Sequence, residues 1–255
     1  MKDIHAKAML GDCLKRMNEI EDHSVDLILC DLPYGTTQNK WDTVIPFDKL
    51  WEQYRRICKG AIVLTAQPPF DKVLGASNIS MLKYEWIWQK ENGTGHLNAK
   101  KSPLKNHENV LVFYDNQPTY NPQMRFGFKP YKIGNGEVIK STNYGKHVRA
   151  IVESKGERYP LTIIKFNRDP SKIHPTQKPV ALMEYLIKTY TNEGDLVLDN
   201  CMGSGTTGVA AVNTNRSFIG IEQNPEYYKI AVNRIKEAKI KHDKEQKTGK
   251  LFSKK

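Results

Sequence analysis

The chemically distinctive residues in the first part of the chain are Asp31, Leu32, Pro33 and Tyr34. They directly follow residues 25–30, an apolar run that predicts a buried strand, and ligands of open α/β sheets bind where strands end. Pro33 fixes its own φ angle and favours an extended Leu32, so the turn is expected to be rigid. It would offer a carboxylate, main-chain carbonyls and a flat ring, which together suit a planar group carrying an NH2. Alone, the same four residues would also fit an ordinary strand-to-loop turn.

A glycine-containing turn in the last part of the chain has a different chemical signature. Residues 195–199 predict a strand that runs into Gly203 and Gly205, then a short helix, then a strand that ends in Glu222. Glycines allow a tight turn and a close approach of the backbone to a ligand. An acid about 20 residues further along can accept both hydroxyls of a ribose. In this context we predict a nucleoside cofactor rather than a structural turn.

The spacing alone does not decide the kind of nucleoside. Gly208 stands three residues after Gly205, as in a dinucleotide fingerprint, so NAD is not excluded. We expect Gly208 to allow close packing of the helix on the strand. Asp199 is less typical of an NAD site, because it would lie near a cationic amine. It therefore favours a nucleoside that carries an amino acid.

The composition restricts the class of protein. A chain of 255 residues is long enough for one large α/β domain with a real core and a small insertion. No apolar run suits a transmembrane helix, and residues 1–5 lack the apolar core of a signal peptide, so we expect a cytoplasmic protein with no membrane partner. Four cysteines without a Cys-x-x-Cys pair indicate neither a metal site nor a disulfide framework. A net charge of +11 is typical of proteins that bind polyanions.

Hydrophobic periodicity predicts strands and helices on either side of an irregular middle segment. The expected strands span residues 6–10, 24–30, 61–65, 84–89, 110–114, 195–199 and 218–222, and the expected helices span residues 13–20, 47–58, 180–190, 209–213 and 225–238. The tail 239–255 holds seven lysines. We expect it to be a fraying helix end followed by a disordered basic arm.

Segment 116–169 has no clear periodicity and is strongly basic. Its ten lysines and arginines outnumber its four acids, and aromatic residues are interleaved with them. This composition favours contact with nucleic acid over an ordinary surface excursion, and the loop at residues 90–109 adds further lysines. The candidate nucleic-acid contacts are Lys100, Lys101, Arg125, Lys129, Lys132, Lys146 and Arg149.

The motifs together resemble those of the β class of amino-group DNA methyltransferases. Residues 31–34 resemble the family's catalytic Asp-Pro-Pro-Tyr motif, and residues 199–207, Asp-Asn-Cys-Met-Gly-Ser-Gly-Thr-Thr, resemble its S-adenosylmethionine motif. Residues 174–179, His-Pro-Thr-Gln-Lys-Pro, match the segment that precedes the cofactor motif, and Gly11-Asp12 resembles the segment near the cofactor adenine. The resemblance covers nearly all of residues 5–238.

Three residues depart from the family pattern. Leu32 and Asn200 stand where the family has prolines, and Cys201 stands where it has a phenylalanine. Leu32 would loosen the catalytic turn but leave its carbonyl in place. Asn200 and Cys201 would alter the fit around the methionine end of the cofactor without changing the reaction.

The resemblance implies a Rossmann-like, mostly parallel α/β sheet of seven strands, with helices on both faces and a circularly permuted order of motifs. Residues 1–115 would form the catalytic half, 116–169 a target-recognition insertion and 170–238 the cofactor half, followed by the basic tail 239–255. The strands that precede the two motifs would be neighbours. The implied contacts to S-adenosylmethionine are Asp12, Lys178, Asp199, Cys201, Gly203, Ser204, Gly205, Thr206, Glu222 and Gln223. No metal is implied.

The resemblance further implies a reaction on a base flipped out of double-stranded DNA. Asp31 and a main-chain carbonyl near Leu32 and Pro33 would accept the hydrogens of the base NH2, and Tyr34 would stack on the ring. Family members that begin this motif with Asp mostly methylate adenine N6, so we predict adenine N6, with cytosine N4 as the alternative. No cysteine follows a proline, which disfavours a cytosine-C5 enzyme.

Two further classes of protein fit parts of the pattern. One is an RNA or small-molecule methyltransferase, and the second is a catalytically inactive DNA-binding homologue. A second copy of the chain and a restriction endonuclease are the protein partners that the family suggests. Trp41 would either close over a flipped base or pack beneath its loop, and His174 would be either a site residue or a cap or core histidine.

Overall fold

The computed structural model of the protein describes residues 4–35, 42–143, 145–169 and 177–252. The chain divides into a larger unit, formed by Met1–Asn121 with Thr162–Lys255, and a smaller unit, Pro122–Leu161. Trp41 and His174 lie outside the described residues, so their possible roles stay predictions. No helix within the described ranges is both long and apolar enough to cross a membrane.

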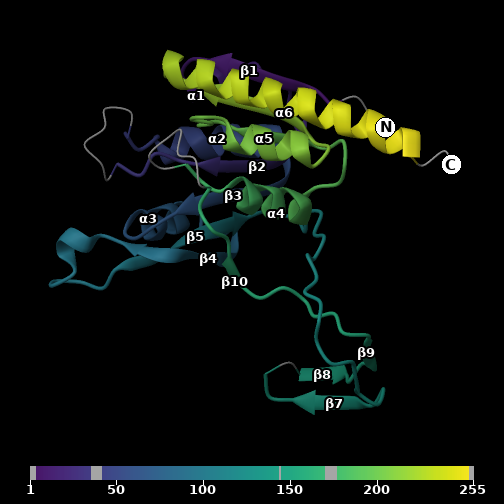
Figure 1. Ribbon diagram of the computed structural model, residues 1–255. Helices are drawn as coiled ribbons and strands as arrows, with labels where there is room; N and C mark the ends of the chain where they lie inside the picture. The colour runs from purple at the N-terminus through teal and green to yellow at the C-terminus, as the bar shows by residue number, and fades with distance from the viewer. Residues whose placement is uncertain (1–3, 36–41, 144, 170–176, 253–255) are drawn as a thin grey trace. The chain divides into compact units, whose positions relative to one another are not determined.

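The larger unit is built on one sheet of eight strands (Figure 1). Its strands are β1 (Ala6–Leu10), β2 (Val25–Asp31), β3 (Cys58–Ala66), β4 (Leu82–Thr94), β5 (Lys105–Phe113), β10 (Ile163–Lys165), β11 (Leu196–Asp199) and β12 (Ser217–Glu222). They lie in the order β1-β12-β11-β2-β3-β5-β4-β10. Only β5 runs antiparallel to its neighbours β3 and β4. The predicted mostly parallel α/β fold is therefore confirmed, with one strand more than expected.

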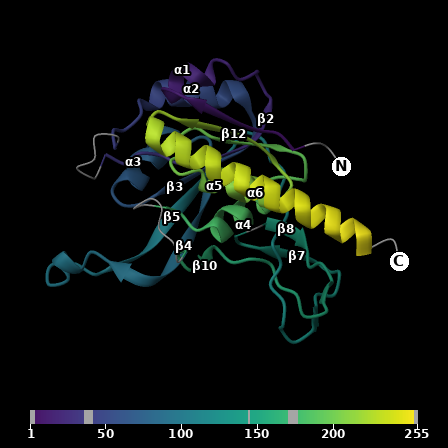
Figure 2. The same cartoon turned by 45° about the horizontal axis from the view of Figure 1, so that its top comes forward.

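Helices cover both faces of this sheet. They are α1 (Cys13–Met17), α2 (Phe47–Ile57), α3 (Phe70–Ser77), α4 (Val180–Tyr190), α5 (Thr206–Asn213) and α6 (Pro225–Phe252), and a short 3-10 helix spans His96–Asn98. Side chains of α1, α2 and α3 pack on one face, and those of α4, α5 and α6 pack on the other, where the three helices lie together in Figure 2.

Several elements differ from the sequence prediction. Helix α3 was not predicted, α1 ends at Met17, and β4 and β5 extend into the predicted loop at residues 90–109 as far as Thr94 and Lys105. Helix α6 continues to Phe252 instead of ending near residue 238, because the lysine-rich tail still contains good helix formers between its charges. Strand β10 comes from the segment predicted to be irregular and pairs in parallel with β4. Its three residues are too few to show a period of two in the sequence.

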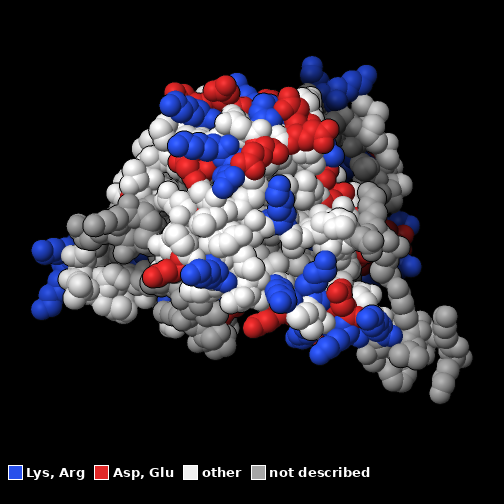
Figure 3. Space-filling model, turned by 90° about the horizontal axis from the view of Figure 1, so that it is seen from above, with Lys and Arg blue, Asp and Glu red and all other residues white. Residues whose placement is uncertain are grey.

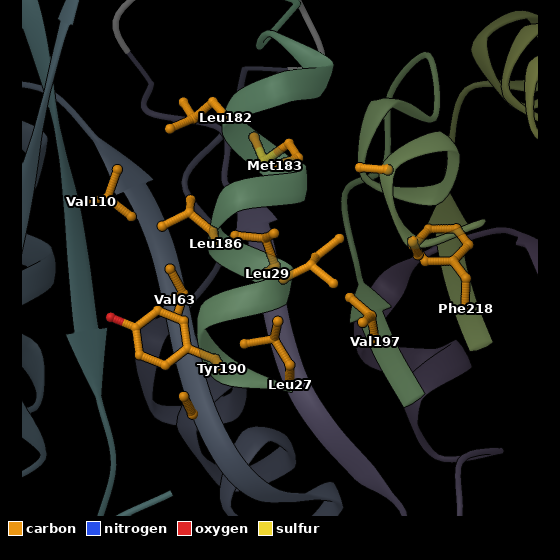
Figure 4. Packing of buried hydrophobic residues seen from close by; sticks show 14 of the residues in the cluster. Leu27, Leu29, Val63, Val110, Leu182, Met183, Leu186, Tyr190, Val197 and Phe218 are labelled. Atoms are coloured by element: carbon orange, nitrogen blue, oxygen red, sulfur yellow. The ribbon is translucent and has the colours of Figure 1, made fainter. Parts of the chain in front are cut away.

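The apolar core holds β2 from both sides. Leu27 and Leu29 point toward Leu186 and Met183 of α4 (Figure 4), whereas Ile28 and Cys30 belong to the opposite layer, which contains the buried face of α2. All these side chains are nearly inaccessible to solvent. Burial of each large apolar side chain contributes about 1.5–3 kcal/mol. The carboxyl end of β2, where Asp31 lies, is therefore attached to the most constrained part of the sheet.

The sheet order brings distant parts of the chain together. Strand β11 pairs in parallel with β2 on one side and with β12 on the other, with Val197 opposite Leu27. The expected adjacency of the strands before the two motifs is confirmed. Because these strands are parallel, Asp31, Asp199 and Glu222 end at the same edge of the sheet.

The smaller unit contains two short antiparallel pairs and little apolar burial. Strand β6 (Tyr131–Ile133) pairs with β9 (Val152–Ser154), and β7 (Val138–Ser141) pairs with β8 (Gly145–Val148). None of its described apolar side chains belongs to the buried core. Arg158 links its parts instead, since the guanidinium donates to Ser154 Oγ and to the carbonyl of Lys129 and lies 4.3 Å from the Tyr131 ring centre.

Gly60 sets the register between β2 and β3. Val25 pairs with Cys58 but Leu27 pairs with Ala61, so β3 carries an extra residue here. A Cβ atom at Gly60 would overlap the carbonyl oxygen of Asp26. We expect Gly60→Ala to lower the free energy of unfolding by about 1–3 kcal/mol, because backbone must move to make room.

Gly75→Ala is the matched control in α3, where the added Cβ would meet its nearest atom at 3.4 Å. This variant should be neutral or more stable by up to about 1 kcal/mol, because alanine is the better helix former. Urea unfolding of both variants measures the difference. Equal stabilities would show that β2 and β3 can change register freely.

Candidate active site

A cavity of about 500 Å³ lies in the larger unit at the edge where β2, β11 and β12 end. Both motif regions line it. The catalytic candidates Asp31, Leu32, Pro33 and Tyr34 contribute, as do nine of the ten cofactor candidates, namely Asp12, Lys178, Asp199, Cys201, Gly203, Ser204, Thr206, Glu222 and Gln223. Its size lies within the usual range of small-molecule sites, roughly 300–1,000 Å³.

The Asp31 carboxylate is held by three side chains from three parts of the fold. Its Oδ1 accepts hydrogen bonds from the Tyr34 hydroxyl, at 2.7 Å, and from the Thr65 hydroxyl at the end of β3. Its Oδ2 accepts from Lys178 Nζ at 2.6 Å. A carboxylate has about four acceptor positions. The described residues fill three of them, which leaves one position on Oδ2 for a donor in the cavity.

Lys178, predicted to contact the cofactor, lies in the cavity beside Asp31. Its ammonium lies between Asp31 and Glu108, 3.3 Å from Glu108 Oε2, and its side chain is 6% exposed. Burial by itself lowers the pKa of Lys178, but the two facing carboxylates outweigh this effect and raise the pKa well above its usual value. Contact with the cofactor stays a prediction, and the geometry favours a role at Asp31.

Glu108 and Lys90 complete this charged group. Lys90 Nζ lies 2.5 Å from Glu108 Oε1. Burial favours the neutral form of Glu108, but Lys178 and Lys90 together lower its pKa. The antiparallel direction of β5 places Glu108, near its start, at the same sheet edge as the end of β3. Lys90 and Glu108 both line the cavity.

The ring of Tyr34 is held by an aromatic neighbour. It stacks on Phe70 of α3, with ring centres 5.0 Å apart and planes at 28°. Burial, followed by the nearby Asp31 charge, raises the pKa of its hydroxyl, so the hydroxyl remains a donor to Asp31. The expected stacking of Tyr34 on a base stays a prediction.

The glycine turn forms the other wall of the cavity. Gly203 has a φ of +51°, and an added Cβ would meet no described atom within 4 Å, so there is open space beside the turn. Glu222 Oε2 accepts from the Gly203 amide at 2.9 Å. Gly205, with a φ of +81°, does not line the cavity. It begins α5 and faces Ala231 of α6.

Arg234 of α6 holds the glycine turn through hydrogen bonds to Ser204. Its guanidinium donates to the Ser204 carbonyl at 2.6 Å and to Ser204 Oγ at 2.9 Å. The Glu222 carboxylate keeps further acceptor positions, since each oxygen accepts one amide in the described structure. A close-approach turn beside a carboxylate fits a ribose with two hydroxyls.

Asp199 and Asp12 add negative charge to this half of the cavity. Asp199 is buried and accepts from the Cys201 amide at 3.1 Å, and burial raises its pKa to about 6. Asp12 caps α1 by accepting from the Lys15 amide at 3.0 Å. Asp12 therefore is a helix cap and also lines the cavity. These two acceptor carboxylates suit a nucleoside that carries a cationic amine.

The departures from the family pattern are accommodated by neighbouring packing. Leu32 is 4% exposed and belongs to the apolar layer beneath the cavity. Asn200 Oδ1 accepts a buried hydrogen bond from the Tyr54 hydroxyl of α2 at 2.6 Å. Cys201 packs at the edge of the same layer. A larger aromatic residue at position 201 would therefore need this layer to rearrange.

Sequence reasoning missed Thr65, Glu108, Lys90 and Arg234. Thr65 carried a usable signal, because it ends a predicted buried strand just as Asp31 follows one. Glu108 precedes an apolar run without any local motif, and only the antiparallel pairing of β5 brings it to the site. Arg234 reaches the turn from the middle of a long helix. No group of His, Cys, Asp and Glu within the described residues is arranged to hold a metal ion.

None of the candidate nucleic-acid contacts is among the residues that line the cavity. Lys100 and Lys101 are exposed in the turn between β4 and β5. Basic side chains project at the left edge of Figure 3, on the side where this hairpin extends in Figure 1. The smaller unit contains Arg125, Lys129, Lys132, Lys146 and Arg149. Arg125 donates to the Tyr159 carbonyl at 3.0 Å and so also supports that unit internally.

The fold is an α/β sheet with a cavity at the edge where β2, β11 and β12 end, and this cavity is lined by a fixed carboxylate and a glycine turn. Comparison with known proteins identifies the family. Residues 70–233 match the N6/N4 family model described as "DNA methylase". The chain belongs to this family of DNA methyltransferases.

Two curated relatives match over most of both chains. The DNA adenine methyltransferase YhdJ of Escherichia coli (strain K12) is 28% identical over 94% of this chain and 88% of its own length. The type II methyltransferase M.HpaI of Haemophilus parainfluenzae is 30% identical over 90% of this chain and 74% of its own length.

Solved structures agree with the fold. The M1.HpyAVI-SAM complex has a TM-score of 0.60 and 25% identity, and covers 90% of this chain and 99% of that one. The PvuII DNA methyltransferase, a cytosine-N4-specific enzyme, has a TM-score of 0.67 at 16% identity over 90% of this chain and 86% of that one. At that identity the likeness concerns the fold alone.

Asp199 gives a pH test of this site. Its pKa of about 6 lies above the usual 3.8, so the folded protein binds this proton more tightly than the unfolded chain does. The cost of the buried charge is therefore present above about pH 6 and disappears as the pH falls toward 4. Relative to Asp199→Asn, the wild type should gain about 2–3 kcal/mol of stability between about pH 7.5 and pH 4.

The measurement is urea unfolding of both proteins at several pH values without a methyl donor. Because the two proteins share all other titrating groups, their difference isolates Asp199. If the free energies of unfolding of the two proteins changed in parallel across the whole pH range, the Asp199 carboxylate would not be buried as the structure shows.

Proposed function

We propose that this protein transfers a methyl group from S-adenosylmethionine to adenine N6 in double-stranded DNA. The observation that carries the proposal is the single cavity that contains both the Asp31 turn and the glycine turn. A donor on one wall and an acceptor amine on the other would lie within reach of direct transfer. Fixing two reactants in this way can lower a barrier by about 7–11 kcal/mol in the best cases.

The residues of the glycine turn would hold the cofactor. Glu222 would accept the ribose hydroxyls, Gly203 would allow the close approach, and Asp199 would face the amine of the methionine end. The cofactor supplies an electrophilic methyl group on a positively charged sulfur. The SAM complex of M1.HpyAVI supports this assignment by similarity.

Asp31 would act on the amine of the target base. The remaining acceptor position on Oδ2 receives one N–H, so the nitrogen lone pair turns away from the ring and toward the methyl group. The nitrogen–carbon bond forms as the carbon–sulfur bond breaks, and the electron pair of that bond stays on sulfur. The nitrogen then releases one proton to Asp31 or to water. No covalent bond to the protein is required.

Adenine is favoured over cytosine by the Asp at position 31 and by the name of the Escherichia coli relative. Both bases present an exocyclic NH2, so the mechanism alone allows either. N4 methylation of cytosine is therefore the second candidate. The type II name of the Haemophilus parainfluenzae relative supports a restriction endonuclease as a companion of this enzyme.

Methylation of a base in duplex DNA would require base flipping. A base amine inside a duplex is not accessible, and extrusion costs roughly a few kcal/mol. Phosphate contacts from Lys100, Lys101 and the smaller unit would offset that cost. The exposed aromatic and basic side chains of that unit suit contact with nucleic acid.

Mass spectrometry of nucleosides released from treated duplex DNA tests the proposal. Wild type should yield N6-methyladenine. Asp31→Ala should yield none while binding S-adenosylmethionine normally in titration calorimetry. Glu222→Ala should bind the cofactor about 10- to 100-fold more weakly, because a charge-assisted hydrogen bond is lost, and should recover turnover at high cofactor concentration.

Different products would point to different enzymes. N4-methylcytosine as the sole product would establish the cytosine reaction. Preferential methylation of RNA or of free bases would establish a different substrate class. Binding of cofactor and DNA without any methylated product would identify an inactive homologue.

The DNA contacts are tested by the salt dependence of affinity. We expect the logarithm of the binding constant to fall linearly with the logarithm of salt concentration, with a slope that loses about 0.9 for each phosphate contact removed. Replacing Lys100 and Lys101 together by Glu should flatten this slope. Lys49→Glu on α2, where the lysine is exposed, is the control and should leave it unchanged. Equal slopes in all three proteins would remove the β4–β5 turn from the DNA interface.

A further inference from the structure

Four charged side chains of alternating sign form a row beside the cavity. Lys90 Nζ lies 2.5 Å from Glu108 Oε1, Lys178 Nζ lies 3.3 Å from Glu108 Oε2, and the same nitrogen lies 2.6 Å from Asp31 Oδ2. They come from β4, β5, the segment before α4 and the end of β2. Their formal charges cancel, so the loss of any one member leaves the row with a net charge.

Stability alone does not account for this row. Lys178 and Glu108 are 6% and 7% exposed, and a buried ion pair can often be replaced by apolar residues without loss of stability. The row instead ends on the carboxylate that the proposed reaction uses, and all four of its members line the cavity. Buried charges in a cleft are typical of functional sites.

We propose that Lys178 is a positioning residue that holds Asp31 in one rotamer, and that Glu108 receives Lys178 when the target amine binds Asp31 Oδ2. This inference rests on the proposed function, because it requires the base amine at Asp31. It assigns no cofactor contact to Lys178. Lys178 therefore acts through Asp31, and Glu108 acts through Lys178.

Lys178 has two carboxylate partners at different distances. Its ammonium is close to Asp31 and more distant from Glu108. Within the described structure, the buried Glu108 Oε2 has no aligned hydrogen bond, so it can accept one if the ammonium moves. Such a movement would widen access to Asp31 Oδ2 without leaving a buried charge unpaired. Lys90 holds the other oxygen of Glu108 and keeps that carboxylate in place.

The test measures single-turnover methylation of duplex DNA at saturating cofactor. In Lys178→Met, the rate should fall roughly 100-fold through misplacement of the Asp31 carboxylate. Lys178→Arg, which keeps the charge and can still donate to Asp31, should restore most of this rate.

Glu108→Gln tests the second half of the proposal. With only Asp31 as a charged partner, Lys178 should compete with the base, so KM for DNA should rise on the order of tenfold. The double variant Lys178→Met, Glu108→Gln restores the charge balance of the row. It should fold as well as wild type and still show the reduced methylation rate of Lys178→Met, which a purely structural role would not produce.

Three outcomes would overturn the inference. One is a Lys178→Met methylation rate equal to that of wild type. Another is a double variant with normal kinetics. The third is a Lys178→Met variant whose main defect is weaker binding of S-adenosylmethionine in calorimetry, which would support the cofactor role instead. Asp31→Ala separates this inference from the proposed function, since full activity of that variant would refute the proposed function itself.

Discussion

The parallel pairing of β2 with β11 is the constraint on which the whole site depends. Val197 lies opposite Leu27 and Leu198 opposite Ile28, and the Asp26 carboxylate accepts from the Leu196 amide at 2.9 Å. The paired strands come from opposite ends of the chain. Without this pairing, Asp31 and Asp199 would end at different places, and no single cavity could contain both motifs. The apolar side chains of α4 cover this junction and make the register costly to change.

The charges at this sheet edge follow from the same arrangement. Parallel strands bring Asp31, Asp199 and Glu222 together, and like charges oppose one another. The protein neutralises only the first of them with a buried lysine, Lys178. Burial instead raises the pKa values of Asp199 and Glu222. A ligand with a positive charge and ribose hydroxyls would therefore find its partners on one wall, while the other wall is already compensated.

The sequence predicted what depends on local pattern and strong motifs. The apolar face of α2, the strand before Asp31 and the glycine turn before α5 each have a periodicity or a residue type that only one structure satisfies. The resemblance to a family then supplied the strand adjacency, which no local signal contains. The position of Lys178 was not predictable, because it depends on Glu108, and Glu108 reaches the site only through long-range antiparallel pairing.

The smaller unit shows why composition can indicate a function where periodicity fails. Many of its described apolar side chains, such as Phe126 at 77% and Ile151 at 59%, remain exposed. No alternating pattern is needed when no face is buried, which is why the sequence of this unit looked irregular. It relies on Arg158, whose guanidinium packs on Phe128 and Tyr131.

The smaller unit, Pro122–Leu161, contains eight basic residues and three acids. It therefore carries a strong positive charge, and its described residues form no apolar core whose burial would offset the repulsion between these charges. A polyanion that binds the folded unit in preference to the unfolded chain would add stability that the unit cannot obtain from burial. Contact with DNA would therefore serve both recognition and the order of the segment that performs it.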